Sequence, residues 1–422
     1  MRIVHLSTHD MWGGAAIAAF RLHTKLRDMG QESTMLVANR TGEGQDVLTF
    51  SPPRDFQSRM IRMLRRKALA YDLNRYPRSG LDHGELFSDD RSANGKAPYC
   101  QIPPCDILHL HLIAGFLDSR SLFNWVPRGL PMVWTLHDLN PFTGGCHFDA
   151  GCKRYRENCG ACPKLGTSKE NDLSRQIWNR RHSVYSRISP AQLQLVAPCR
   201  WVAEEVQQSS LLGRFPVTVI PYGINIETFA PRDRAFARDA LDIPREAKVL
   251  IFAALNVSER RKGFSLLIEA LKGLREDPNL FLLVVGSHAA VQQSGIPYRA
   301  LGYISSEHLL SIAFSAADLT VVPTLQETGP MIVMESLACG TPVVGFPAGD
   351  MPAIVRPGVT GMLVDSGDAA ALREGILGLL ENRETLSQMR VKSRQVAVEE
   401  YSSELFAKRH LALYKARLEN SS

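Results

Sequence analysis

The feature that most constrains the fold of this chain is an alternation of short apolar runs with longer amphipathic segments, found in both halves. Such alternation is typical of β-α-β units, in which parallel strands are covered by helices on both faces. The pattern therefore predicts an α/β fold with two doubly wound Rossmann-like domains. Strands are predicted at residues 3–6, 33–37, 107–111, 132–136, 193–196, 249–253, 281–285, 319–322 and 343–346, and helices at 15–26, 264–274 and 406–418.

The length of the chain also requires more than one domain. Its 422 residues exceed what a single hydrophobic core usually organises. Proline and glycine interrupt the apolar pattern between Arg214 and Gly223, as is typical of a domain boundary. We therefore predict a first domain over residues 1–218 and a second domain over residues 219–404.

Composition narrows the class of protein. Apolar residues make up 45% of the chain and charged residues 22%, the balance of an ordinary globular protein. Met1-Arg2 runs directly into an apolar segment without the pattern of a secretory signal, and no apolar run reaches transmembrane length. A cytoplasmic location is therefore expected. The net charge of +6 is mild for this length and does not indicate nucleic acid as a partner.

Basic residues are concentrated near residues 59–70, where they alternate with methionine, isoleucine and leucine. This pattern predicts a basic amphipathic helix. Such a helix could lie on the anionic cytoplasmic face of the inner membrane, with its apolar stripe buried and its arginines near lipid phosphates. The alternative is a solvated surface helix that packs on its own domain.

Two acids, Glu327 and Glu335, are separated by seven residues and enclose a predicted helix start at Gly329-Pro330. Free N–H groups at a helix start attract phosphate, and a carboxylate in the preceding loop can accept hydrogen bonds from sugar hydroxyls. The arrangement indicates a donor-sugar site. An ordinary crossover with a capping acid would give the same spacing.

Together with other motifs, this segment resembles the signature of the family-four retaining glycosyltransferases, enzymes with the GT-B fold. The resemblance covers nearly the full chain, and its motifs lie at residues 1–6, 13–14, 135–138, 219–225, 261–263 and 327–335. It implies an acceptor-side first domain and a nucleotide-sugar-binding second domain that face each other across a cleft, with the C-terminal helix 405–422 returning to the first domain.

The resemblance also implies an activity. A hexose-type sugar is expected to move from a nucleotide diphosphate donor, with retention and without a catalytic metal. The expected acceptor is a glycan or a lipid-linked molecule, in bacterial exopolysaccharide or lipopolysaccharide synthesis.

Two motifs of the first domain directly follow predicted strands. Gly13-Gly14 lacks side chains, so backbone N–H groups there could approach a diphosphate, although a tight turn would use the same residues. The resemblance assigns His137 a contact with the transferred sugar or the donor phosphate, and an imidazole at that place can donate a hydrogen bond. Asp138 is expected to set the tautomer of His137 or to cap the next segment. His109 and His111 are expected to be packing or loop-anchoring residues.

The resemblance assigns Lys262 to the donor diphosphate, where a fixed cation stabilises the charge of the leaving group. The arginine that the family carries five or six residues earlier is missing, and Asn256 stands near its place. Arg260 or Arg261 is expected to substitute for it. A solvated basic loop is the alternative interpretation.

The resemblance also supplies the remaining donor contacts. Glu327 is expected to face the donor sugar, and Glu335 to accept hydrogen bonds from both ribose hydroxyls. Backbone N–H groups at the helix start serve the phosphate or sugar, although Pro330 has none to offer. The predicted catalytic residues are His137, Lys262 and Glu327, and the predicted donor-binding residues are Gly13, Gly14, Asn256, Arg261, Lys262, Tyr303, Ile304, Glu327, Gly329, Met331, Ile332 and Glu335.

Four of the eight cysteines, Cys146, Cys152, Cys159 and Cys162, have the spacing C-x5-C-x6-C-x2-C. The last pair has the spacing of half a zinc knuckle. In a reducing cytoplasm such a set favours a structural zinc ion over disulfides. Free thiols and a redox or iron–sulfur role are the alternatives.

Two other classes of function remain open at this stage. A nucleotide-sugar epimerase would share the two-domain architecture and the diphosphate site, but it would lack the combination of Arg-Lys-Gly with the two spaced acids. A non-catalytic binding module would use the cysteine loop and the basic helix for interaction, and it would need neither acid.

Overall fold

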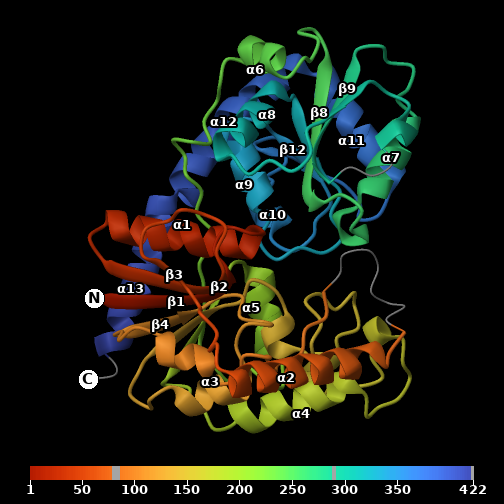
Figure 1. Cartoon of the computed structure of the whole chain (residues 1–422). Helices are drawn as coiled ribbons and strands as arrows, with labels where there is room; N and C mark the ends of the chain where they lie inside the picture. Colours follow the sequence, from red (N-terminus) through yellow and green to blue (C-terminus); the bar gives the residue numbers. More distant parts are fainter. Residues whose placement is uncertain (78–85, 288–290, 420–422) are drawn as a thin grey trace. The chain divides into compact units, whose positions relative to one another are not determined.

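The computed structural model describes residues 1–77, 86–287 and 291–419, and the chain forms two compact units (Figure 1). Unit 1 comprises Met1–Pro221 and Phe406–Ser422, and unit 2 comprises Tyr222–Leu405. Each unit contains its own parallel sheet and its own buried core. The prediction of two Rossmann-like α/β domains is therefore confirmed.

The sheet of unit 1 has the strand order β3-β2-β1-β4-β5-β6-β7, and its strands pair in parallel. The order reverses between β1 and β4. In an open α/β sheet, ligands bind beyond the carboxyl ends of the strands at such a reversal. The strands are β1 (Arg2–His9), β2 (Glu32–Asn39), β3 (Val47–Thr49), β4 (Ile107–Leu110), β5 (Met132–Thr135), β6 (Leu193–Ala197) and β7 (Val217–Val219).

Side-chain caps explain where several helices of unit 1 begin. The carboxylates of Asp118 and Asp172 each accept a hydrogen bond from a backbone N–H in the first turn of the helix that follows. The C-terminal helix belongs to this unit because the Tyr414 hydroxyl lies 2.7 Å from Nδ1 of His109 on β4. The helices are α1 (Gly14–Asp28), α2 (Phe56–Asn74), α3 (Ser119–Trp125), α4 (Leu173–Tyr185), α5 (Arg200–Gln207) and α13 (Ser403–Glu419).

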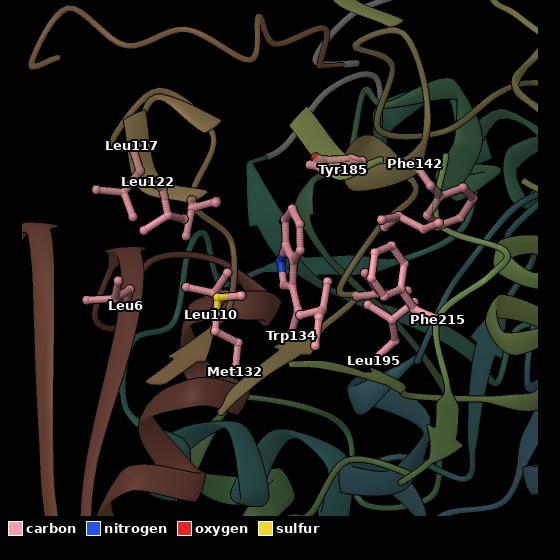
Figure 2. Close-up of a cluster of buried hydrophobic side chains, with 14 of the residues drawn as sticks. Leu6, Leu110, Leu117, Leu122, Met132, Trp134, Phe142, Tyr185, Leu195 and Phe215 are labelled. Carbon is pink, nitrogen blue, oxygen red and sulfur yellow. The ribbon is translucent and has the colours of Figure 1, made fainter. Parts of the chain in front are cut away.

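One face of the central strands builds the larger core of unit 1. Figure 2 shows Leu110, Met132, Trp134 and Leu195 pointing into a cluster that also contains Tyr185. Because strand side chains alternate between the two faces, the residues between them point the other way. On β4, this alternation sends His109 to the opposite face, where it meets α13.

The sheet of unit 2 has the order β10-β9-β8-β11-β12-β13 and reverses between β8 and β11. Its core contains Leu250, Phe252, Leu282 and Val321, and helices pack on the sheet. The strands are β8 (Lys248–Asn256), β9 (Leu280–Ser287), β10 (Tyr298–Ala300), β11 (Leu319–Val322), β12 (Val343–Gly345) and β13 (Gly361–Leu363). The helices are α6 (Arg234–Ala240), α7 (Phe264–Lys272), α8 (Glu307–Ala316), α9 (Met331–Ala338), α10 (Met351–Ile354), α11 (Ala369–Glu381) and α12 (Arg383–Tyr401).

The edge strands β3, β7, β10 and β13 were not predicted. Each is three residues long, which is too short to display a period of two or a distinct apolar run. Among the described residues, no helix combines the length and the apolar character that crossing a bilayer requires.

Candidate functional site

The strand reversal of unit 2 brings three predicted site residues together. Lys262 ends a short 3₁₀ turn, Arg260–Lys262, that follows β8, and Glu327 lies in the loop after β11. Nζ of Lys262 lies 2.5 Å from Oε2 of Glu327, and Nη1 of Arg261 lies 3.3 Å from the same oxygen. Because β8 and β11 are neighbours, the two loops leave the sheet side by side.

Arg261 is held in place by two further partners. Its Nη1 donates to the carbonyl of Gln326 at 2.8 Å, and its Nε donates to the Glu259 carboxylate at 3.0 Å. Leu325 donates its backbone N–H to the carbonyl of Arg261 at 2.8 Å. The two loops are thus tied through both side chain and backbone. Of the two arginines that the sequence analysis considered as a second cation, Arg261 is the one that lies beside Glu327.

Two glycines allow this close approach. Gly263 has φ +73°, and a Cβ atom there would lie 1.8 Å from the carbonyl oxygen of Pro323. Gly349 has φ +57°, and its Cβ would lie 1.8 Å from the carbonyl oxygen of Glu327. Only glycine fits at these positions, so both loops that meet at Glu327 depend on a missing side chain.

The electrostatics of the site are dominated by this cation pair. Burial by itself would raise the pKa of Glu327, but the Lys262 ammonium and the Arg261 guanidinium outweigh it and lower the pKa to about 2. Glu327 is therefore ionised at neutral pH. A nearby acid that the sequence analysis missed, Asp350, directly follows Gly349, and burial raises its pKa to about 7.

The helix that carries the second acid begins one residue later than predicted. Pro330 is the N-cap of α9, and Met331 donates its N–H to the Gly329 carbonyl at 2.9 Å. Ile332 is partly exposed in the first turn, and Glu335 is 5% exposed on the second turn. The Met331 N–H is thus already used by the chain, and the helix start lies within one residue of the predicted position.

The other donor residues predicted for unit 2 lie at the carboxyl end of the same sheet or beside it. Asn256 ends β8, and its Oδ1 accepts hydrogen bonds from the backbone and hydroxyl of Ser258. Tyr303 is 47% exposed, and the loop that it shares with Ile304 follows β10. Asn256 therefore shapes the turn that leads to Lys262.

In unit 1, the predicted glycines form the start of α1. Gly13 is the N-cap with φ +82°, and Gly14 is the first residue of the helix. The turn lies beyond the carboxyl end of β1, beside the reversal of the strand order. An N-terminus without a side-chain cap presents backbone N–H groups to a ligand there.

His137 follows β5 and is 7% exposed. Burial lowers its pKa to about 4, so the imidazole is neutral near pH 7. Of the two roles expected of Asp138, the structure shows the cap: its carboxylate accepts the Asn140 backbone N–H at 2.8 Å and lies 2.6 Å from Nδ1 of His147. Nε2 of His137 lies 3.0 Å from Nδ1 of His111.

The four predicted metal ligands line one small cavity. Its volume is about 20 Å³, and its walls include Cys146, Cys152, Cys159 and Cys162. Gly144 donates its N–H to the sulfur of Cys159 at 3.1 Å. No disulfide links these residues among the part of the chain that the structure describes.

The predicted basic helix is α2. Asp55 caps it, and within Phe56–Asn74 no residue is buried. Its larger apolar side chains are therefore exposed, among them Phe56 at 79%, Leu64 at 55% and Tyr71 at 66%.

The segment that matches a known family lies within unit 2. Residues 233–396 match the family model "Glycosyl transferases group 1". The chain is 33% identical over 186 residues to the D-inositol 3-phosphate glycosyltransferase of Geodermatophilus obscurus. This alignment covers 40% of this chain and 41% of that protein. It is 31% identical over 249 residues to D-inositol 3-phosphate glycosyltransferase 1 of Catenulispora acidiphila, covering 53% and 59%. The chain thus spans about half the length of the curated relatives it matches.

Solved structures match along the whole chain. Sucrose-phosphate synthase from Thermosynechococcus elongatus has a TM-score of 0.67 at 18% identity, covering 100% of both chains. Anabaena HepE in complex with UDP-glucose has a TM-score of 0.65 at 16% identity, covering 99% of this chain and 100% of that one. At such identities the likeness shows the fold, which is the GT-B type with two Rossmann-like domains.

Proposed function

We propose that this chain is a retaining glycosyltransferase that moves a hexose-type sugar from a nucleotide diphosphate donor to a hydroxyl of a glycan or lipid-linked acceptor. The observation that carries the proposal is the contact of Lys262 and Arg261 with Glu327 at the strand reversal of unit 2. These residues lie in the segment that matches the glycosyl transferases group 1 family. Retention and a setting in cell-surface polysaccharide synthesis are supported by the sequence resemblance.

The proposed chemistry depends on charge at the leaving group. When the bond between sugar and diphosphate breaks, negative charge develops on the β-phosphate, and a fixed cation in a partly dry site stabilises it. The Lys262 side chain is 23% exposed and is already held by Glu327. We expect the diphosphate to replace Glu327 as the counter-charge of Lys262, which leaves the Glu327 carboxylate to accept hydrogen bonds from the sugar hydroxyls.

The remaining residues hold the donor and the acceptor. In unit 2, the start of α9 offers a favourable helix dipole for phosphate, although the Met331 N–H is bonded to the Gly329 carbonyl. In unit 1, the start of α1 at Gly13-Gly14 has no side-chain cap and offers backbone N–H groups to an anion. His137, neutral at physiological pH, donates a hydrogen bond to the sugar or the phosphate. The acceptor hydroxyl loses its proton to the departing phosphate on the same face of the sugar, which gives retention without a covalent intermediate.

A structural zinc ion is part of the proposal. Cys146, Cys152, Cys159 and Cys162 line one cavity with room for roughly one water-sized occupant. Among the described residues their sulfur atoms do not form a compact ligand set like that of His5, His109 and His111, so a bound zinc ion would have to draw the loop together. Burial raises the pKa of the Cys159 thiol to about 12, whereas a bound zinc ion deprotonates its ligands and crosslinks the loop. Cys146, Cys152, Cys159 and Cys162 would hold it, and a complete cysteine set leaves no open position for catalysis.

Helix α2 is proposed to bind the cytoplasmic face of the membrane. Phe56, Met60 and Leu64 recur at helical spacing, and Arg59, Arg62 and Arg66 form a neighbouring stripe. Exposed apolar groups beside arginines suit an anionic lipid surface. A peripheral position there would place the enzyme beside a lipid-linked acceptor.

Calorimetric titration with UDP-glucose, followed by the other common nucleotide diphosphate sugars, tests the proposed function. We expect one nucleotide sugar to bind and to be slowly hydrolysed or transferred, with turnover at least about 100-fold lower in Lys262→Ala. Lys272→Ala is the matched control, because this lysine lies on the exposed face of α7 and forms an ion pair with Glu269, away from Glu327. Conversion of the donor to an epimer would indicate an isomerase, and binding to none of the nucleotide sugars would contradict the proposal.

A further inference from the structure

Three histidines of unit 1 form a continuous hydrogen-bonded chain, here called the histidine chain. Nδ1 of His5 on β1 lies 2.9 Å from Nε2 of His111, which follows β4. Nδ1 of His111 lies 3.0 Å from Nε2 of His137, which follows β5. Since β1, β4 and β5 are consecutive in the sheet, the chain crosses the strands and ends at the predicted catalytic histidine.

All three rings are neutral under ordinary conditions. His5, His111 and His137 are 0%, 2% and 7% exposed, and burial lowers the pKa of each imidazole. A neutral imidazole carries one N–H donor and one acceptor nitrogen. His111 must therefore donate to one neighbour and accept from the other, so only two arrangements of protons satisfy both bonds.

The far end of the chain distinguishes the two arrangements. Nε2 of His5 is buried and has no hydrogen-bond partner among the described residues. If His111 donated to His5, the single proton of His5 would sit on that nitrogen as a buried N–H without an acceptor, which proteins rarely tolerate. If His5 donates to His111, the proton of His5 lies on Nδ1 within that hydrogen bond. Nε2 of His5 then carries only a lone pair, which is less costly to leave without a partner than a buried N–H.

We propose that His5 and His111 are positioning residues that hold His137 as the tautomer with its proton on Nδ1. His5 donates to His111, and His111 donates to Nε2 of His137. The meaning of this for catalysis rests on the proposed function, in which His137 donates a hydrogen bond to the sugar or phosphate. This role is one of the two that the sequence analysis considered for Asp138, whose carboxylate bonds to His147 and to the Asn140 N–H.

Other buried histidines nearby are bonded outside the chain. His109 binds Tyr414 and Thr135 at 2.7 and 2.8 Å, and His23 binds Ser33 and the Gln45 carbonyl. His109 packs against the rings of both His5 and His111, with centroid distances of 5.1 and 4.1 Å. His109 is thus as buried as His5 and His111, but its ring nitrogens bond to Tyr414 and Thr135 and not to the histidine chain. It is therefore a matched control.

A bound metal ion is the competing explanation of the cluster. One nitrogen each of His5, His109 and His111 lie within 4.8 Å of one another. A metal on those nitrogens would replace the protons of the chain. The hydrogen bonds are favoured because both His5–His111 and His111–His137 contacts have ordinary hydrogen-bond lengths.

The test is the tautomer of His137 in the full chain, read from two-bond ¹H–¹⁵N correlations of ¹⁵N-labelled, deuterated protein near neutral pH. We expect the wild-type protein to show His137 with its proton on Nδ1. In His5→Phe the donor to His111 is lost, so the signal of His137 should change to a mixture or to the other tautomer. In His109→Phe it should stay as in the wild type.

Several results would overturn the inference. These are a proton on Nε2 of His137 in the wild type, an unchanged His137 in His5→Phe, or stoichiometric metal bound to the cluster by elemental analysis. If His5→Phe does not fold, the wild-type spectrum still decides the direction of the chain. The readout needs no substrate, so loss of the proposed transferase activity and loss of the tautomer are separate outcomes.

Discussion

Nζ of Lys262 and Oε2 of Glu327 lie 2.5 Å apart, although 65 residues separate them in the chain. The contact exists because β8 and β11 are neighbours at the strand reversal, so the loops that follow them share one edge of the sheet. Under the proposed function, this contact would hold the Lys262 ammonium in place before the donor phosphate binds. The same contact makes the stability of unit 2 dependent on pH.

The folded-state pKa of Glu327 is about 2, below the ordinary value of 4.5. A lowered carboxylate pKa stabilises the fold above the unfolded value, and this stabilisation is lost as pH falls from about 4.5 toward 2. The shift corresponds to roughly 3 kcal/mol at neutral pH. We expect Glu327→Gln to lower the calorimetric Tm of unit 2 at neutral pH, and the difference from the wild type to shrink near pH 3.

Glu269→Gln is the control for this prediction. Glu269 pairs with Lys272 on an exposed helix face, where an ion pair contributes little to stability. The Tm of Glu269→Gln should therefore equal that of the wild type at every pH. A Glu327→Gln protein with a wild-type pH profile would contradict the assignment of the lowered pKa.

Gly263→Ala should destabilise unit 2 and weaken donor binding together. A Cβ at Gly263 would lie 1.8 Å from the Pro323 carbonyl oxygen, so the Lys262 turn and the β11 loop would have to separate. We expect a loss of more than about 2 kcal/mol in unfolding free energy. Gly367→Ala is the matched control, because Gly367 has φ +79° with nothing within 4 Å of its Cβ and should cost only about 1 kcal/mol.

The sequence marked the loops that form this cluster because their motifs are local. The glycine and proline around residue 329 mark a helix start, and Lys262-Gly263 marks a turn, so each loop could be recognised separately. Which loops meet depends on strand order, and strand order depends on packing among residues far apart in the chain. For this reason the sequence left the role of Asp138 open between setting the tautomer of His137 and capping. It did not reveal that His111, which follows another strand, lies within hydrogen-bonding distance of His137.

A signal for the histidine chain was nevertheless present. His109 and His111 alternate along one strand and so share a face of the sheet, while His5 lies on the first strand. Buried histidines at a period of two are an unusual use of a core face. The information that was missing is the register of His5 against His109 in the parallel pair β1 and β4.

Helix α2 should bind anionic lipid vesicles. Reversing three charges in Arg59→Glu, Arg62→Glu and Arg66→Glu should weaken co-sedimentation with anionic vesicles by about 100-fold or more, since each basic residue near the surface contributes about 1 kcal/mol. Phe56→Ser should weaken binding without changing its dependence on salt. Equal binding of the wild type to neutral and anionic vesicles would contradict the role of the arginines.

The cysteine loop should contain one zinc ion per chain, measured by elemental analysis of protein purified without added metal. Cys159→Ser removes a ligand from the cavity that all four thiols line, so metal content and Tm should both fall. Cys199→Ser is the control, because Cys199 is also buried in unit 1 but caps α5 by accepting the Val202 N–H. Serine caps helices well, so this variant should keep its zinc and its Tm. A metal-free wild type, or a Cys159→Ser protein as stable as Cys199→Ser, would mean that the loop is held by packing and by hydrogen bonds such as that from Gly144 to the Cys159 sulfur.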